Sequence, residues 1–183
     1  IAGMLPPAGG ILEINGKPVS RFTPRSMQAL GVGRIPEDRM GTGLIPALPL
    51  SSCMVLPRIQ DQRFNRCGFL KHAAIRRFAD QQIESFGIKA AGNQVATGTL
   101  SGGNLQKYIM GREILQRPGV LVVSQPTWGV DAGAAAAIHQ ALVDLAGAGS
   151  AIVVISQDLD ELLSLCDTLA VINGGRLSKP MQV

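Results

Sequence analysis

Aromatic and charged side chains are both scarce in this chain, at 4% and 16% of its 183 residues. So few aromatic rings argue against a platform on which nucleic-acid bases stack. No run of Lys and Arg exceeds two residues, so the net charge of +4 does not indicate nucleic-acid binding. No apolar run approaches the roughly 18 residues of a membrane helix, and no signal peptide is visible. Contact with a membrane would therefore go through a partner.

Metal-ligating residues are equally sparse. The three cysteines, Cys53, Cys67 and Cys166, are odd in number and widely spaced, and His72 and His139 stand alone. No Cys/His pair has the spacing of a zinc site. We interpret the cysteines as reduced thiols of a cytoplasmic protein.

A phosphate-binding loop of the form Gly-x-x-x-x-Gly-Lys-Ser/Thr is also missing. The nearest string, Gly16-Lys17-Pro18, fails because Ile11 stands where the first glycine belongs and Pro18 offers no hydroxyl group. The string fits a β-hairpin over residues 10–20 better, because Asn15-Gly16 suits a type I′ turn.

The remaining pattern predicts strands that alternate with helices, and hence a largely parallel sheet. Thr23 and Pro24 predict the start of a short helix, and residues 40–71 are irregular. Apolar residues at helical spacing predict a helix that stops at Gly87. The expected helices cover 24–29, 104–116, 132–146 and 158–165 and a region with one apolar face (Ile75, Phe78, Ala79, Ile83, Phe86); the expected strands are 32–35, 120–123 and 151–155, with a terminal hairpin around 173–175. The strands 120–123 and 151–155 are expected to be buried.

One motif indicates binding chemistry. Ser101, Gly102 and Gly103 open the helix at 104–116, where free N–H groups and the positive end of the helix dipole attract anions. A terminal phosphate is the expected ligand. The alternative is an ordinary helix start preceded by two flexible glycines.

Four segments resemble, in their order along the chain, the motifs of ABC-transporter ATPases. They are Gly33–Arg39 (Q-loop region), Leu100–Lys107 (signature motif), Gly119–Asp131 (Walker B strand, Pro-Thr turn and D-loop) and Ile152–Glu161 (switch). The forms Pro-Glu-Asp-Arg and Gln-Pro-Thr most resemble the second, C-terminal ATPase half of importers for simple sugars or nucleosides.

The resemblance implies a fold and a domain plan. It implies a P-loop NTPase-like α/β fold with a mainly parallel sheet, an antiparallel portion, a RecA-like core over 1–49 and 100–183, and a helical lobe over roughly 50–99. Since no Walker A motif is present, we expect a partial nucleotide-binding domain that begins after its own Walker A.

The chain departs from the family at its own nucleotide site. The Walker B aspartate and the glutamate that follows it, the base, correspond to Ser124 and Gln125. The switch histidine corresponds to Gln157, and Glu37 stands at the Q-loop glutamine. Serine carries no charge to balance Mg²⁺, and an amide accepts no proton at neutral pH. We therefore expect degenerate metal (Ser124, Glu37) and catalytic (Gln125, Gln157) positions, and an isolated chain that is inactive as an ATPase.

The signature motif is intact, and in the family it acts on the partner domain's nucleotide. The resemblance assigns ATP contacts across that interface to Ser101, Gly102, Gly103, Gln106 and Asp131. Asp131 is also a candidate N-cap of the helix at 132–146, and both roles can hold at once. Trp128 could pack at the same interface or cover the Pro126 turn. Arg39 could sense phosphate or the helical lobe, but we expect a solvated loop residue.

The implied function is that of the ATP-binding subunit of an importer for sugars or nucleosides. ATP and Mg²⁺ would be bound through the composite site. The expected partners are a second nucleotide-binding domain of the same protein and transmembrane permease subunits, which hold the protein at the cytoplasmic face of the membrane. Self-association through an exposed strand edge is a further expectation. The alternative is a non-hydrolysing ABC-like module that binds nucleotide or a partner.

Overall fold

The computed structural model describes residues 2–183. Short helices, turns and strands alternate along the whole chain. In order they are β1 (Glu13–Ile14), β2 (Lys17–Pro18), α1 (Pro24–Ala29), β3 (Val32–Ile35), η1 (Arg39–Gly43), α2 (Leu50–Val55), η2 (Leu56–Arg58), β4 (Asn65–Arg66), β5 (Phe69–Leu70), α3 (His72–Ser85), η3 (Thr97–Thr99), α4 (Gly102–Ile114), β6 (Val120–Ser124), α5 (Ala132–Gly147), β7 (Ala151–Ile155), α6 (Leu159–Leu165), β8 (Thr168–Leu169), β9 (Ile172–Asn173), β10 (Arg176–Leu177) and β11 (Met181–Gln182).

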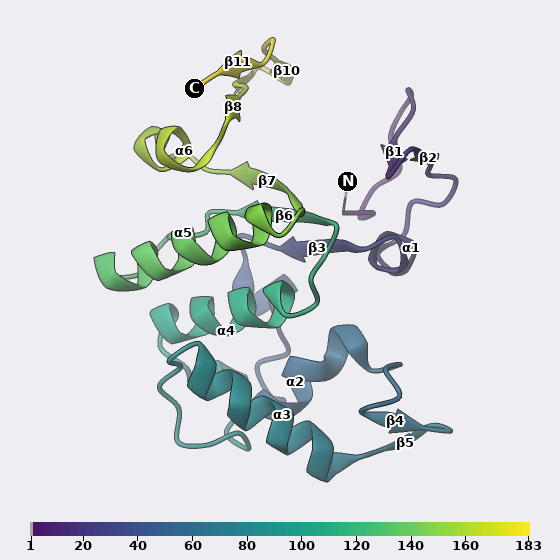
Figure 1. The fold of residues 1–183 in the computed structure, drawn as a ribbon, viewed down its shortest axis with the longest axis vertical. Helices are drawn as coiled ribbons and strands as arrows, with labels where there is room; N and C mark the ends of the chain where they lie inside the picture. Colours follow the sequence, from purple (N-terminus) through teal and green to yellow (C-terminus); the bar gives the residue numbers. More distant parts are fainter. Residues whose placement is uncertain (1) are drawn as a thin grey trace.

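A parallel sheet of three strands, in the order β3-β6-β7, forms the centre of the molecule. Val123 of β6 pairs with Ile35 of β3 on one side and with Val154 of β7 on the other. Helices α4 and α5 cover one face of this sheet, and α2 and α3 lie beyond α4 (Figure 1). The predicted α/β fold with a parallel sheet and antiparallel hairpins is confirmed.

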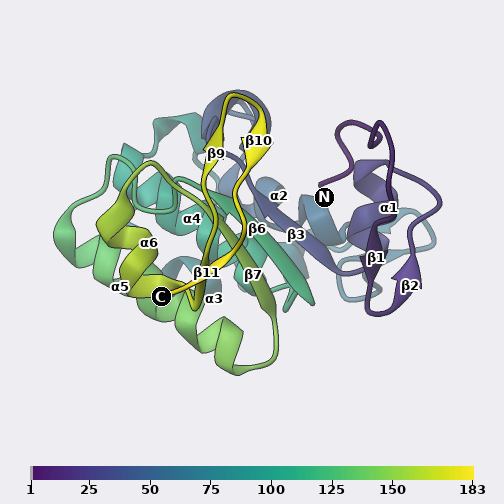
Figure 2. The ribbon, with the colours of Figure 1, turned by 90° about the horizontal axis from the view of Figure 1, so that it is seen from above.

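The local turn chemistry follows the sequence closely. Asn15 and Gly16 both have positive φ angles, as a type I′ turn requires, and Glu13 pairs with Pro18 across the hairpin. Thr23 caps α1 by accepting the N–H of Ser26, and Pro24 is its first residue. Figure 2 shows this hairpin and α1 beside β3, the first strand of the sheet. Ile14, Met27 and Val32 form a small core between them.

Residues 40–71 contain more structure than predicted. They hold most of η1, then α2, η2 and the β4–β5 hairpin. Helix α2 starts directly after Pro49, and it buries Leu50, Cys53 and Met54 at helical spacing. The proline-rich surroundings hid this short helix, whose stability comes from the core that it enters.

The strand β7 is not buried as predicted. Ala151, Val153 and Ile155 are exposed, while Ile152 and Val154 pack against the core beneath α5. The reason is that β7 ends the sheet, and within residues 2–183 no element packs on its second face. A depression of about 1120 Å³ lies beside β7 and is lined by residues of β7, α5 and α6 and of the strands β8, β9 and β10.

Strand β6 matches its prediction on one face only. Leu121 and Val123 are buried, whereas Val120 and Val122 are half-buried. In the described part of the chain, no helix is long and apolar enough to cross a membrane.

An ion pair is buried in α4. The Arg112 guanidinium lies 2.8 Å from Glu113, both side chains are buried, and the amide of Gln116 donates to the second carboxylate oxygen at 2.7 Å. Burial raises the pKa of Glu113, and the contacts with Arg112 and Gln116 oppose that rise. A buried pair of this kind costs most when one partner is removed.

We therefore expect Arg112→Ala to lower the free energy of unfolding by about 3–5 kcal/mol, because an unpaired carboxylate would remain in the core. Arg63, which pairs with Asp61 at the surface, is the matched control. Arg63→Ala should cost less than about 1 kcal/mol. Denaturant unfolding of both variants measures the difference, and equal losses would show that the buried pair has no special weight.

Candidate functional site

The start of α4 is shaped by Ser101 and Asn104. Ser101 occupies the N-cap position, but its hydroxyl group makes no capping bond to the helix. It accepts a hydrogen bond from the Asn104 amide at 2.9 Å, and the Asn104 oxygen accepts the backbone N–H of Lys89 at 2.8 Å. Because Ser101 acts as an acceptor here, its hydroxyl proton stays available to donate to another group.

The glycines at this helix start have open space beside them. A Cβ atom added to Gly103 would meet nothing within 4 Å, and one added to Gly102 would meet only the Gly129 carbonyl oxygen, at 3.8 Å. By contrast, a Cβ on Gly111 in the same helix would lie 2.7 Å from the Phe86 ring. Packing inside the chain therefore explains Gly111 and does not explain Gly103.

Ser101 and Gly103 line a small polar depression of about 230 Å³, together with Lys89, Asn104, Lys107, Gly129, Val130 and Asp131. We call it the α4 depression. Its two lysines face one carboxylate, and the first N–H groups of α4 open at the same place. This combination of charge and donors suits an anion.

Asp131 serves as the N-cap of α5. Its carboxylate accepts the N–H of Ala134 at 2.9 Å, and mainly for this reason the pKa of Asp131 lies below its usual value. The structure thus confirms the capping role, and Asp131 also lines the α4 depression, where the predicted contact across an interface would occur.

Four predicted site residues lie at the carboxyl ends of the three parallel strands: Ser124 is the last residue of β6, and Glu37, Gln125 and Gln157 follow the ends of β3, β6 and β7. The register places them at one edge of the sheet, and the Gln125 N–H extends the ladder by donating to the Ile155 carbonyl at 2.8 Å. Gln125 is buried with a φ of 50°, while Glu37 and Gln157 are exposed.

This strand-end group offers one carboxylate and otherwise neutral oxygens. Within residues 2–183, no three His, Cys, Asp or Glu side chains come together as a metal site. Mg²⁺ prefers carboxylate oxygens and keeps several waters. The donor set of Ser124, Gln125 and Glu37 does not by itself fit that ion.

Gln106 lies inside the molecule and not on the wall of the α4 depression. Its side chain is completely buried, its amide nitrogen donates to the Pro126 carbonyl, and its oxygen has no hydrogen-bond partner among the described residues. The side chain braces the turn that follows β6. A direct contact of Gln106 with ATP stays a prediction that this conformation does not support.

The segment 124–131, which we call the β6–α5 turn, carries Trp128 and is held by Arg39. The Arg39 guanidinium donates to the Trp128 carbonyl, and burial lowers the pKa of Arg39. Arg39 is therefore a structural contact, and the expectation of a solvated loop arginine is wrong. The Trp128 residue is 68% exposed, so it does not cover the Pro126 turn within this chain.

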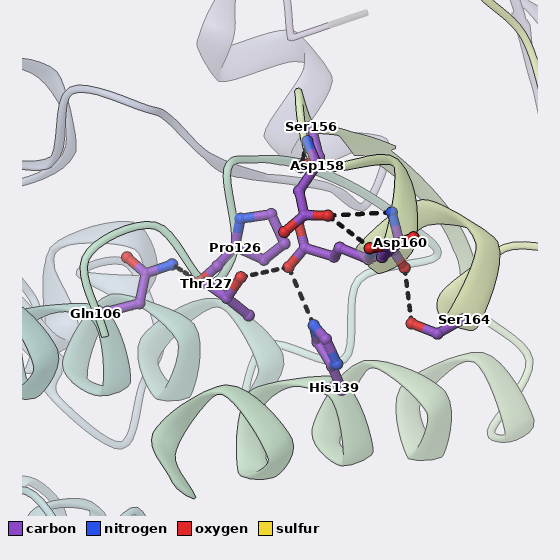
Figure 3. Close-up of polar contacts among 9 residues, drawn as sticks. Gln106, Pro126, Thr127, His139, Ser156, Asp158, Asp160 and Ser164 are labelled. Carbon is purple, nitrogen blue, oxygen red and sulfur yellow. Dashed lines mark hydrogen bonds and ion pairs between the residues drawn. The ribbon is translucent and has the colours of Figure 1, made fainter. Parts of the chain in front are cut away.

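Sequence reasoning missed a polar cluster around Glu161 in α6. One oxygen of this carboxylate accepts the Thr127 hydroxyl at 2.6 Å and contacts His139 Nε2 at 3.0 Å (Figure 3). Burial alone would raise the pKa of Glu161, but the hydrogen bonds from Thr127, His139 and Ser156 together bring it below its usual value. The three main members lie 12 and 22 residues apart, so no local pattern announces the cluster.

Known proteins resemble this chain in sequence and in fold. No protein-family model matches the chain. The nucleoside import ATP-binding protein NupA of Lactococcus lactis is 36% identical over 177 residues, which are 97% of this chain and 35% of that protein. The guanosine import ATP-binding protein NupO of Bacillus subtilis is 33% identical over 97% of the chain and 35% of its own length. A ribose import ATP-binding protein of Rhizobium etli is 35% identical over 94% of the chain and 34% of its own length.

Solved structures share the fold. The ATP-binding cassette MJ0796, in a dimeric post-hydrolysis state bound to ADP and phosphate, matches with a TM-score of 0.80 and 19% identity over 100% of this chain and 77% of that one. A nucleotide-free cassette from an ABC transporter matches with a TM-score of 0.75 and 20% identity over 100% of this chain and 73% of that one. The chain spans about a third of the length of the curated relatives it matches. Over almost its whole length the chain is a homologue of the ABC import ATP-binding proteins, and its fold is that of an ABC ATPase cassette.

Proposed function

We propose that this chain is the signature-bearing part of an ATPase domain in an ABC importer for simple sugars or nucleosides. It completes the ATP site of a partner domain, and its own strand-end site is degenerate. The relatives named above are import ATP-binding proteins for nucleosides, guanosine and ribose. These relatives support a sugar or a nucleoside as the transported solute. They also support a role beside permease subunits at the membrane.

The observation that carries the proposal is the unoccupied space beside Gly103. Glycine inside a helix costs about 0.5–1 kcal/mol relative to alanine, and nothing in this chain requires it there. A phosphate that comes close to the helix start from outside does require it. The Ser101 hydroxyl proton and the charges of Lys89 and Lys107 supply the matching donors and field.

The exposed Trp128 supports a partner on the same side. It belongs to the β6–α5 turn, whose next three residues line the α4 depression. A large indole with 68% exposure is a common feature of surfaces that another protein covers. In this function ATP and its Mg²⁺ are bound mainly by the partner domain, and this chain adds the donors of the α4 depression.

The first test is Gly103→Ala, because it adds a single methyl group. Gly147→Ala is the matched control, since Gly147 is also helical, also has open space at its Cβ position, and lies away from the α4 depression. Both variants should stabilise the fold by about 0.4–1 kcal/mol. Only Gly103→Ala should reduce ATP hydrolysis by the assembled transporter, and Ser101→Arg should abolish it while nucleotide binding persists. Full activity of Ser101→Arg would refute the proposed function.

The second test addresses the degenerate site in the assembled protein, with the partner domain's own base disabled. Single-turnover hydrolysis should then be very slow. The double variant Ser124→Asp/Gln125→Glu should raise it by about 100-fold or more, because it returns a negative charge for the metal and a proton acceptor. Fast hydrolysis before that replacement would show that the strand-end site is active as it stands. No response in either test would favour a non-hydrolysing binding module.

A further inference from the structure

Three elements meet at a single buried carboxylate. Glu161 belongs to α6, which begins two residues after Gln157, while Thr127 belongs to the β6–α5 turn and His139 to α5. The Glu161 side chain is 4% exposed, and one of its oxygens contacts both partners, at 2.6 and 3.0 Å. Figure 3 shows dashed contacts from Thr127 and His139 that meet at one carboxylate oxygen, which the two distances identify as that of Glu161.

Hydrogen bonds at the start of α6 fix the backbone that carries the Glu161 side chain. Asp158 caps α6 by accepting the N–H groups of Asp160 and Glu161, at 3.0 and 3.2 Å. The Ser164 hydroxyl donates to the Glu161 carbonyl at 2.9 Å. A buried carboxylate persists only when it is hydrogen-bonded, so its partners must follow it when α6 moves.

The β6–α5 turn is held on adjacent residues by two different helices. Gln106 of α4 donates to the carbonyl of Pro126, and Glu161 of α6 accepts from the side chain of Thr127. The same turn continues into Gly129, Val130 and Asp131, which line the α4 depression. A displacement of α6 therefore reaches the α4 depression through one short stretch of backbone.

We propose that Glu161 is a positioning residue that, through Thr127 and His139, couples the segment after β7 to the shape of the α4 depression. The inference rests on the proposed function, since it concerns the site that the chain lends to its partner. In this arrangement the state of the strand-end site sets how well the depression receives the partner's nucleotide. The coupling uses a fixed negative charge and needs no titrating group at Gln157.

The test uses the assembled transporter and the pair Thr127→Val and Thr127→Ser. Valine keeps the shape of threonine and loses the hydroxyl group, whereas serine keeps the hydroxyl group. Thr127→Val and Glu161→Gln should each lower the kcat of ATP hydrolysis at least about fivefold, the lower end of typical coupling between sites, with KM for ATP nearly unchanged. Thr127→Ser should retain the activity of the unmodified protein.

Asp160→Asn is the control for charge, because Asp160 is an exposed neighbour of Glu161 whose carboxylate has no hydrogen bond among the described contacts. It should leave kcat unchanged. The double variant Glu161→Gln/Thr127→Val should be no worse than the more damaging single variant, because both remove one interaction. Melting temperatures of all variants show whether any loss is simply unfolding.

Three results would overturn the inference. Thr127→Val could match the unmodified protein, Asp160→Asn could lose as much activity as Glu161→Gln, or losses in kcat could follow the melting temperature across the series. The proposed function fails separately, when Ser101→Arg leaves hydrolysis intact. A protein that needs Ser101 and tolerates Thr127→Val would retain the proposed function and lose only the coupling.

Discussion

The pairing of β6 between β3 and β7 is the constraint on which the rest of the structure depends. It brings the residues after Ile35, Val123 and Ile155 to one edge, although they are distant in the sequence. The bond from the Gln125 N–H to the Ile155 carbonyl continues the ladder past the end of β6. From that point the chain must turn back into α5, and the backbone conformation of Gln125, with its φ of 50°, starts the turn. That turn carries Gly129, Val130 and Asp131, which line the α4 depression.

A short turn with so many functional neighbours needs contacts from several elements. Arg39, Gln106 and Glu161 hold consecutive parts of it, at Trp128, Pro126 and Thr127. Each contact is a polar group from a different segment; the Gln106 contact is buried, the Glu161 contact is partly buried, and the Arg39 contact is exposed. Polar contacts in a low-dielectric interior are directional, so they fix one geometry where apolar packing would allow several. Among the described residues, the side-chain oxygen of Gln106 is the one buried side-chain polar atom without a hydrogen-bond partner. Leaving such an atom unpaired lowers the stability of the fold.

Much of this could be predicted from the sequence wherever a local signal exists. Asn15-Gly16, the Thr23 cap and the Asp131 cap were all predicted correctly, because each depends on bonds within four residues. The helix α2 and the exposure of β7 were not, because each depends on what packs against the element. The Glu161 cluster joins segments that only the folded sheet brings together. The sequence motifs therefore named the candidate site residues, and only the folded structure shows which contacts hold them.

The two ends of the β6–α5 turn differ in charge, and this difference shapes the mechanism. At one end Lys89 and Lys107 surround open helix N–H groups, where a phosphate is attracted. At the other end Ser124 and Gln125 are neutral, so no strong field binds a divalent ion there. If no contact held the turn, the geometry of the α4 depression would be independent of the strand-end residues. The bond between Thr127 and Glu161 ties this turn to α6. Under the proposed function, a domain with an inert site would transmit the movement of α6 to its partner's nucleotide through this bond, and loss of hydrolysis would then be separable from loss of coupling.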